Sequence, residues 1–183
     1  MEKKLKTVKL NNKPKIVVIT GAESTGKSTL TEQLAKHFDT LFMPEIARSY
    51  VEGLNRKYTF NDVEQIAKLQ VENLNYLCTK SVPFVFVDTW LIITKVWFEF
   101  VYNKTPGWLI DEIQKTRVDL FLVCDTDLPW IYDPVRENGG ENRNILQKLY
   151  IENIIEFGFK YQIVQGTDNE RLLNAIKFVE ELN

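Results

Sequence analysis

The stretch GAESTGKSTL, residues 21–30, decides the fold of this chain of 183 residues. It contains the complete Walker A pattern, in which two glycines separated by four residues precede a lysine and a hydroxyl residue. Gly21 and Gly26 let the backbone wrap closely round a phosphate, Lys27 can reach the β- and γ-phosphates, and Ser28 can bind Mg²⁺. The residues predicted to bind the nucleotide are Gly21, Ala22, Glu23, Ser24, Thr25, Gly26, Lys27, Ser28 and Thr29.

The segments on either side of the motif supply the context that it needs. Lys15–Thr20 (KIVVIT) is β-branched and apolar on both faces, as a buried parallel strand should be. Lys27–Phe38 places Leu30, Leu34 and Phe38 at the i, i+4, i+8 spacing of a helix. A strand before the loop and a helix after it predict that the positive end of the helix dipole faces the phosphate.

The rest of the chain alternates between short apolar runs and amphipathic stretches, which favours a parallel α/β sheet of about five strands with helices on both faces. Further strands are predicted at Leu41–Met43, Phe84–Val87, Asp119–Cys124 and Tyr161–Gln165. Helices are predicted at Asn61–Cys78 (N-cap Asn61 with Glu64), Trp90–Tyr102, Pro106–Lys115, Asn144–Phe157 and after Thr167 (N-cap, with Glu170), with a stripe of Leu172, Leu173, Ile176 and Val179. The fold class is therefore a P-loop NTPase of the nucleoside- or nucleotide-kinase type. Residues 1–14 are read as a basic arm and residues 15–183 as a single kinase domain.

Composition excludes several classes. The net charge of −2 argues against a nucleic-acid-binding protein, which normally has a basic face. The apolar runs are too short to cross a bilayer, so no membrane insertion is expected. Cys78 and Cys124 are far apart without metal-ligand spacing and are predicted to be free thiols in a reducing compartment, which favours a cytoplasmic location.

A magnesium nucleotide also needs a carboxylate. Asp88 ends a four-residue apolar strand, and that position in a P-loop fold lies near the phosphates at the carboxyl edge of the sheet. We therefore predict that Asp88 and Ser28 are the metal ligands.

A long segment with two prolines and no clear periodicity, Asp125–Arg143, has the composition of a functional loop. It carries Arg136 and Arg143 around the pair Gly139-Gly140, a plausible hinge. Mobile arginine-bearing lids exclude water and neutralise charge on a transferring phosphoryl group. Arg136 and Arg143, with Lys27 and Asp88, are accordingly the predicted catalytic residues.

These features favour one class of P-loop protein over two others. A GTPase should carry an Asn-Lys-x-Asp motif, and Asn103-Lys104-Thr105-Pro106 lacks the Asp. A motor or AAA-type ATPase needs more chain and normally works as a ring, which the sequence does not indicate. A small-molecule kinase needs a P-loop, an acidic residue for the acceptor hydroxyl and an arginine-bearing lid, and all three are predicted here.

Four segments together resemble the ribosylnicotinamide kinase domain of the NadR family: GAESTGKSTL (21–30), PEIARSYV (44–51), FVFVDT (84–89) and DTDLPWIYDPVR (125–136). The resemblance implies ATP and Mg²⁺ as cofactors and phosphorylation of the 5′-hydroxyl of nicotinamide riboside to nicotinamide mononucleotide. It also implies that Asp88 is the base toward that hydroxyl. A vitamin transporter that supplies the substrate is a plausible functional partner.

The resemblance also assigns residues to the acceptor pocket. Glu45, Arg48 and Tyr50 fall in its E-x-A-R-x-Y segment and would face the acceptor. Trp130 could stack on the cationic nicotinamide ring, an arrangement worth about 0.5–2 kcal/mol. The residues that the resemblance adds in the last segment are Asp127, Trp130 and Asp133, as partners of the cation or its ribose. Of the aromatic run Trp97, Phe98, Phe100 and Tyr102, most members are expected in the core, with one able to wall the pocket.

Two departures from the family leave the acceptor open. NadR proteins usually carry an adenylyltransferase domain, which is not expected here, so the chain would make the mononucleotide but not the dinucleotide. Trp90, included in the predicted acceptor site, stands where NadR kinases often have an acidic residue. Another nucleoside or a vitamin alcohol such as thiamine is then an alternative acceptor, and a nucleotide-dependent regulatory module is the alternative function.

Overall fold

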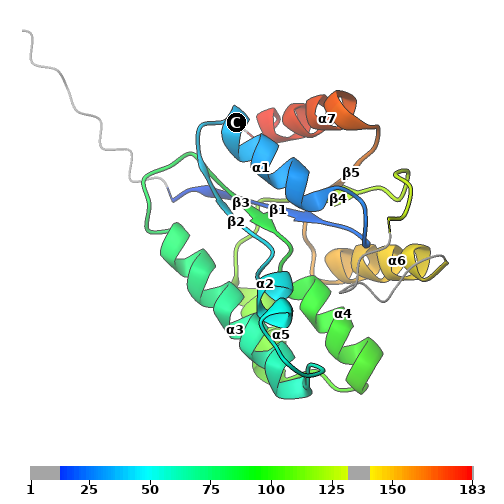
Figure 1. Ribbon diagram of the computed structural model, residues 1–183. Helices are drawn as coiled ribbons and strands as arrows, with labels where there is room; N and C mark the ends of the chain where they lie inside the picture. Colours follow the sequence, from blue (N-terminus) through cyan, green and yellow to red (C-terminus); the bar gives the residue numbers. More distant parts are fainter. Residues whose placement is uncertain (1–12, 132–140, 183) are drawn as a thin grey trace, which may run out of the picture.

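The computed structural model describes residues 13–131 and 141–182. A sheet of five parallel strands, in the order β2-β3-β1-β4-β5, lies between two layers of helices (Figure 1). The strands are β1 (Lys15–Thr20), β2 (Leu41–Met43), β3 (Phe84–Asp88), β4 (Leu120–Cys124) and β5 (Tyr161–Val164). The helices are α1 (Lys27–His37), α2 (Ile46–Glu52), α3 (Phe60–Leu77), α4 (Leu91–Tyr102), α5 (Gly107–Lys115), α6 (Glu141–Glu156) and α7 (Asp168–Glu180). The predicted fold class is confirmed, whereas the division into arm and domain stays a prediction.

The central strand β1 is buried on both faces because successive side chains point to opposite sides of the sheet. Val17 and Ile19 pack with α1 and α7, which cover one face (Figure 1). Ile16 and Val18 belong to the larger cluster on the other face, formed with α3, α4, α5 and α6. Since every strand runs in the same direction, all five carboxyl ends meet at one edge, and the P-loop follows β1 at that edge.

The start of α3 corrects one prediction. Its N-cap is Thr59, not Asn61, and the Thr59 backbone nitrogen donates to Asp62 Oδ2 at 2.7 Å. The Asp62 carboxylate also accepts from Arg56 Nη1 at 2.6 Å and from the Tyr50 hydroxyl at 3.3 Å. This carboxylate therefore joins the start of α3 to α2.

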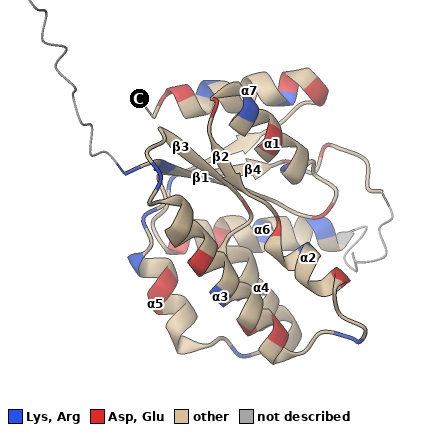
Figure 2. Ribbon diagram, turned by 60° about the vertical axis from the view of Figure 1, so that its left-hand side comes forward, with Lys and Arg blue, Asp and Glu red and all other residues tan. Residues whose placement is uncertain are grey.

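Two further differences concern helices. The helix α2 was not among the predicted elements, and the predicted stripe of α7 was wrong at Leu173, which is exposed. Arg171 occupies the buried side of α7 instead, together with Ala175, Ile176 and Val179. Acidic and basic positions are interspersed along the described helices (Figure 2). Among those helices none is both long enough and apolar enough to span a membrane.

Candidate active site

The P-loop turns sharply between β1 and α1, and its first glycine is required by close contact. Gly21 has φ +133°, and a Cβ there would lie 2.6 Å from the carbonyl oxygen of Cys124 in β4. Gly26, at φ +77°, is the N-cap of α1. The backbone can make this turn because glycine has no Cβ to exclude a positive φ.

Contacts within the loop fix its shape. Thr25 Oγ1 and Lys27 Nζ both donate to the carbonyl oxygen of Ala22 at 2.8 Å. The Ala22 nitrogen in turn donates to Gln147 Oε1 at 2.9 Å, and Gln147 Nε2 donates to the carbonyl oxygen of Cys124 at 2.9 Å. The buried amide of Gln147 in α6 thus joins the loop to the end of β4, a role that the sequence analysis missed. Ser28 and Thr29 are exposed at the start of α1.

Asp88 lies at the carboxyl end of β3 beside the end of β1. It stands opposite Ile19 in the parallel register, and the Thr89 nitrogen donates to the carbonyl oxygen of Ile19 at 2.9 Å. The Asp88 side chain is buried, and Thr89 after it turns the chain at φ +66°, a left-handed conformation that is uncommon for a β-branched residue. The strand ending therefore holds the carboxylate at the edge where the P-loop begins.

The donor set suits Mg²⁺. Ser28 and Asp88 offer a hydroxyl and a carboxylate, the hard oxygen ligands that this ion takes alongside phosphate oxygens and water. No group of three or more His, Cys, Asp or Glu residues that could hold a metal occurs in the described ranges.

A cavity of about 220 Å³ extends from the P-loop to the helices below the sheet. Its P-loop side is formed by Gly21, Glu23 and Lys27. The remaining lining residues come from the segment that includes α2, from α3, from the end of β3 and from α4 and α6: Glu45, Ala47, Arg48, Val51, Tyr58, Gln70, Thr89, Ile93, Thr94, Val96, Trp97, Phe100, Val101, Leu146 and Tyr150. A cavity that joins a phosphate-binding loop to an aromatic and amide wall can hold a second, flat substrate.

Two of the predicted acceptor residues line this cavity. Asp88, also predicted there, is not among the lining residues, but the next residue, Thr89, is. Glu45 precedes α2, and Arg48 in α2 pairs with Glu52 at 2.8 Å. Tyr50 is not among the lining residues, and its hydroxyl contacts Asp62 instead. The E-x-A-R-x-Y segment thus contributes to the cavity wall through two side chains and to the packing of α2 through the third.

The wall contains polar and aromatic residues that the sequence analysis did not assign to it. Gln70 is 1% exposed, and its Oε1 accepts from the Thr94 hydroxyl at 3.0 Å. The rings of Tyr58 and Trp97 meet edge to face at 4.8 Å between centroids. Burial raises the pKa of Tyr150, and the nearby Glu23 acts in the same direction. One member of the aromatic run was expected to line the pocket, and two of them, Trp97 and Phe100, line this cavity.

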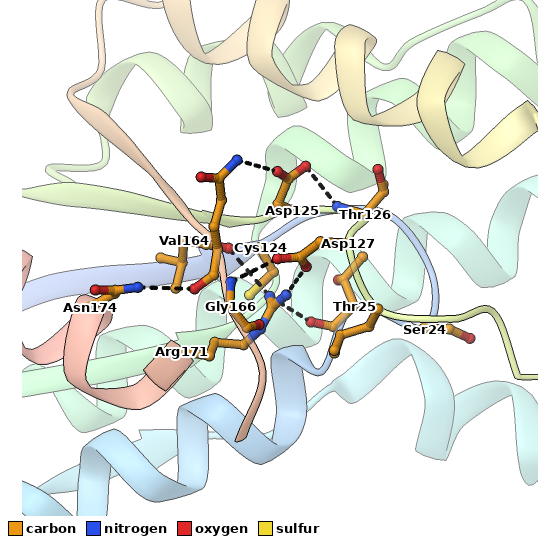
Figure 3. Close-up of polar contacts among 12 residues, drawn as sticks. Ser24, Thr25, Cys124, Asp125, Thr126, Asp127, Val164, Gly166, Arg171 and Asn174 are labelled. Carbon is orange, nitrogen blue, oxygen red and sulfur yellow. Dashed lines mark hydrogen bonds and ion pairs between the residues drawn. The ribbon is translucent and has the colours of Figure 1, made fainter. Parts of the chain in front are cut away.

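Three predicted acceptor residues lie elsewhere. Trp90 is 1% exposed in the large core cluster, where its indole nitrogen has no hydrogen-bond partner among the described residues. Trp130 is exposed and is not among the residues that line the cavity. Asp127 pairs with Arg171 and accepts from the Gly166 nitrogen at 2.7 Å (Figure 3). Contact of these residues with the acceptor has no support in this geometry and stays a prediction.

The predicted lid is described only at its two ends. Asp133, Arg136 and the pair Gly139-Gly140 lie outside the described residues. Arg143 is in the first turn of α6, buried, and its Nη2 donates to the carbonyl oxygens of Ser24 and Leu128 at 3.3 and 3.1 Å. Burial lowers the pKa of Arg143. This arginine therefore touches the P-loop backbone, and its part in phosphoryl transfer stays a prediction.

A family model described as an AAA domain matches residues 16–171. The chain belongs to this family. Chain length and the ring that AAA-type ATPases normally form had argued against this class, and the match shows that neither ground excludes the family that carries the AAA name. The AAA domain of this chain nevertheless has the fold of P-loop kinases. A thymidylate kinase from Ehrlichia chaffeensis superposes with a TM-score of 0.63 at 11% identity, over 94% of this chain and 100% of that one.

The comparisons also confirm the resemblance to NadR. The trifunctional NAD biosynthesis/regulator proteins NadR of Salmonella typhimurium and Escherichia coli are each 27% identical over 172 residues, which is 91% of this chain and 42% of theirs. The chain thus spans less than half the length of these relatives. A NadR structure in complex with NAD and AMP-PNP superposes with a TM-score of 0.71 at 25% identity, over 93% of this chain and 50% of that one.

Proposed function

We propose that this protein is an ATP-dependent kinase that phosphorylates the 5′-hydroxyl of nicotinamide riboside to give nicotinamide mononucleotide. One observation carries the proposal: a single cavity of about 220 Å³ is lined at one side by the P-loop residue Lys27 and at another by aromatic rings and a buried amide. A kinase needs its donor phosphate and its acceptor hydroxyl to share one enclosed space, because transfer occurs in line over a few ångströms.

The donor side would bind the triphosphate of ATP. The amides of the P-loop and the start of α1 would hold the β- and γ-phosphates together with Lys27. Mg²⁺, held by Ser28 and Asp88 when bound, would neutralise charge on the same phosphates. The Asp88 carboxylate would orient the acceptor hydroxyl and take its proton as the new O–P bond forms and the β–γ bridge breaks, leaving ADP.

The acceptor side suits a flat, positively charged ring. Tyr58, Trp97 and Phe100 supply aromatic surfaces, and a cation over such a face gains about 0.5–2 kcal/mol. Glu23 and Glu45 add negative charge to the cavity lining. The Gln70 amide can pair with a carboxamide. A NadR structure solved in complex with NR, which superposes with a TM-score of 0.70 at 24% identity, makes that riboside the first acceptor to test.

A substrate screen by mass spectrometry tests the proposal. Nicotinamide riboside, thiamine and the common nucleosides are each incubated with the protein and Mg-ATP, and the phosphorylated product and ADP are quantified. We expect nicotinamide mononucleotide to form in step with ADP. Faster phosphorylation of thiamine or of a nucleoside would show that nicotinamide riboside is not the preferred acceptor, while the assignment as a kinase would stand. Slow ATP turnover that no acceptor changes would favour a regulatory module instead.

A substitution at the strand end tests the assigned base. Asp88→Asn should reduce phosphoryl transfer at least about 100-fold, the lower end of what a general base contributes, while ATP still binds. The matched control is Asp111→Asn, the same chemical change at an exposed position of α5. Near-normal transfer by the Asp88 variant would exclude this carboxylate as the base.

A further inference from the structure

Two buried arginines hold the backbone carbonyls of the P-loop. Arg171, 4% exposed in α7, donates through Nη1 to the carbonyl oxygen of Thr25 at 3.1 Å (Figure 3). Arg143, 7% exposed in α6, donates through Nη2 to the carbonyl oxygen of Ser24 at 3.3 Å. The two guanidinium groups therefore bind consecutive peptide groups of the loop from two different helices.

Both arginines are themselves fixed by the segment that follows β4. The Arg171 Nη2 pairs with Asp127, whose other carboxylate oxygen accepts from the Gly166 nitrogen at 2.7 Å. The Arg171 Nε donates to the carbonyl oxygen of Gly166 at 2.8 Å. Arg143 Nη2 also donates to the carbonyl oxygen of Leu128 at 3.1 Å. Residues 127 and 128 thus brace the two side chains that reach the loop.

The geometry of a peptide group gives these contacts a consequence for phosphate binding. In a trans peptide the C=O and N–H point in opposite directions. A guanidinium that holds the Ser24 carbonyl directs the Thr25 N–H away from itself, and one that holds the Thr25 carbonyl does the same for the Gly26 N–H. Phosphate-binding loops work by having such N–H groups converge in advance of the ligand.

We infer that Arg143 and Arg171 are positioning residues that preorganise the amides of the P-loop for the triphosphate, with Asp127 as the brace of Arg171. They act through the backbone, without touching the nucleotide. This role rests on the donor half of the proposed function. It differs from the predicted roles of Asp127, in the acceptor pocket, and of Arg143, in the catalytic lid.

The test measures phosphate binding separately from transfer. Affinities of the full chain for inorganic tripolyphosphate and for Mg-ATP are measured by isothermal titration calorimetry for Arg171→Lys, Arg143→Lys and Asp127→Asn. Lysine keeps the charge but cannot reproduce the planar fork that reaches several carbonyls at once. We expect each lysine variant to weaken both ligands about 10-fold or more, since hydrogen bonds to charged groups are the strong ones. Asp127→Asn should weaken them less, and the acceptor KM should not change.

The control is Asn174→Ala, one turn along α7 from Arg171. Asn174 donates to the carbonyl oxygen of Gln165, in the same β5–α7 connection, and among the described residues it has no hydrogen bond to the P-loop (Figure 3). A purely structural role would lower Tm and the active fraction without moving phosphate affinity in the folded protein. If a lysine variant does not fold, Asp127→Asn carries the test because its side chain is 31% exposed.

The outcomes separate this inference from the proposed function. Tripolyphosphate affinities within about twofold of wild type in all three variants would overturn the inference, although transfer by the wild type could stand. A wild type that binds tripolyphosphate but phosphorylates no acceptor would remove the proposed kinase activity and leave the positioning role intact. A wild type that binds neither tripolyphosphate nor ATP would overturn both.

Discussion

Replacing the first glycine of the P-loop by alanine should destabilise the whole sheet, because the loop is pressed against β4. The added Cβ of Gly21→Ala would lie 2.6 Å from the carbonyl oxygen of Cys124, well inside the 3.4 Å at which ordinary contact begins. It would also lie 3.3 Å from Gln147 Oε1. Neither neighbour can yield freely, since the first is backbone in a central strand and the second is held at both ends of its amide.

The magnitude follows from two terms. An alanine forced to φ +133° is strained by about 1–3 kcal/mol, and overpacking against a rigid neighbour adds about 1–3 kcal/mol. The free energy of unfolding should therefore fall by about 2–6 kcal/mol, which for a domain of this size lowers Tm by about 5–20 °C. The control is Gly107→Ala at the start of α5, where a Cβ would meet nothing within 4 Å. There the same change should stabilise by about 0.4–1 kcal/mol.

Urea unfolding followed by circular dichroism, with thermal scans beside it, measures both variants. An unchanged denaturant slope would show that the midpoint shift reports stability. The reasoning is refuted if Gly21→Ala unfolds within about 2 °C of the wild type, a shift of roughly 1 kcal/mol or less. It is also refuted if Gly107→Ala is destabilised to the same extent as Gly21→Ala.

Three further predictions follow from buried polar groups. Gln70→Leu should raise the acceptor KM by about 10-fold or more while leaving the KM for ATP unchanged, because a buried hydrogen-bonding group is lost from the cavity wall; equal acceptor KM values would contradict this. The Arg56 guanidinium, with Thr59, holds the pKa of Asp62 well below its usual range. The ionised Asp62 therefore contributes its full stabilisation above the unfolded pKa of about 4, and this contribution is lost as the pH falls toward the folded pKa. The Tm difference between wild type and Asp62→Asn should therefore shrink in scans from about pH 5 to about pH 2, and a constant difference would refute it. Cys124 is 0% exposed, with its pKa raised to about 11 by burial, whereas Cys78 is partly exposed, although burial raises its pKa as well. Cys78 should therefore react first with a disulfide reagent and Cys124 only on unfolding; two equal rates would exclude this.

The sheet could be predicted from sequence because each strand is a short apolar run. The inner strands β1, β3 and β4 are buried on both faces, whereas the edge strands β2 and β5 are partly exposed. All five predicted strands occur, within one residue of their predicted ends. The predicted start of α3 was wrong because two overlapping pairs, Asn61 with Glu64 and Thr59 with Asp62, have the same capping spacing. Glu64 is occupied elsewhere, since its Oε1 accepts from the Trp108 indole nitrogen at 2.8 Å. A local sequence pattern cannot show which of two candidate capping carboxylates will instead bind a side chain that is distant in the sequence.

The candidate site shows the same limit. The P-loop and the strand-end Asp88 could be located because both depend on neighbours in sequence. The residues of the cavity wall could not be located in this way. The spacing of Gln70 shows which face of α3 it is on, but not that this face borders a cavity. The pairing of Asp127 with Arg171 joins positions 44 residues apart. A charged residue at either position predicts that it has a partner of opposite charge, but does not identify that partner.

The contact between Arg171 and the Thr25 carbonyl joins residues 146 positions apart, and this has a consequence for biosynthesis. A ribosome adding about 5–20 residues per second needs about 7–30 s to make the intervening chain. During that time the nascent loop lacks the arginine that holds it, and β4, whose backbone packs against Gly21, is also made later. The signature that is translated first is therefore among the last parts of the molecule to acquire its final shape. Nucleotide binding during synthesis should reach its full affinity only when α7 docks.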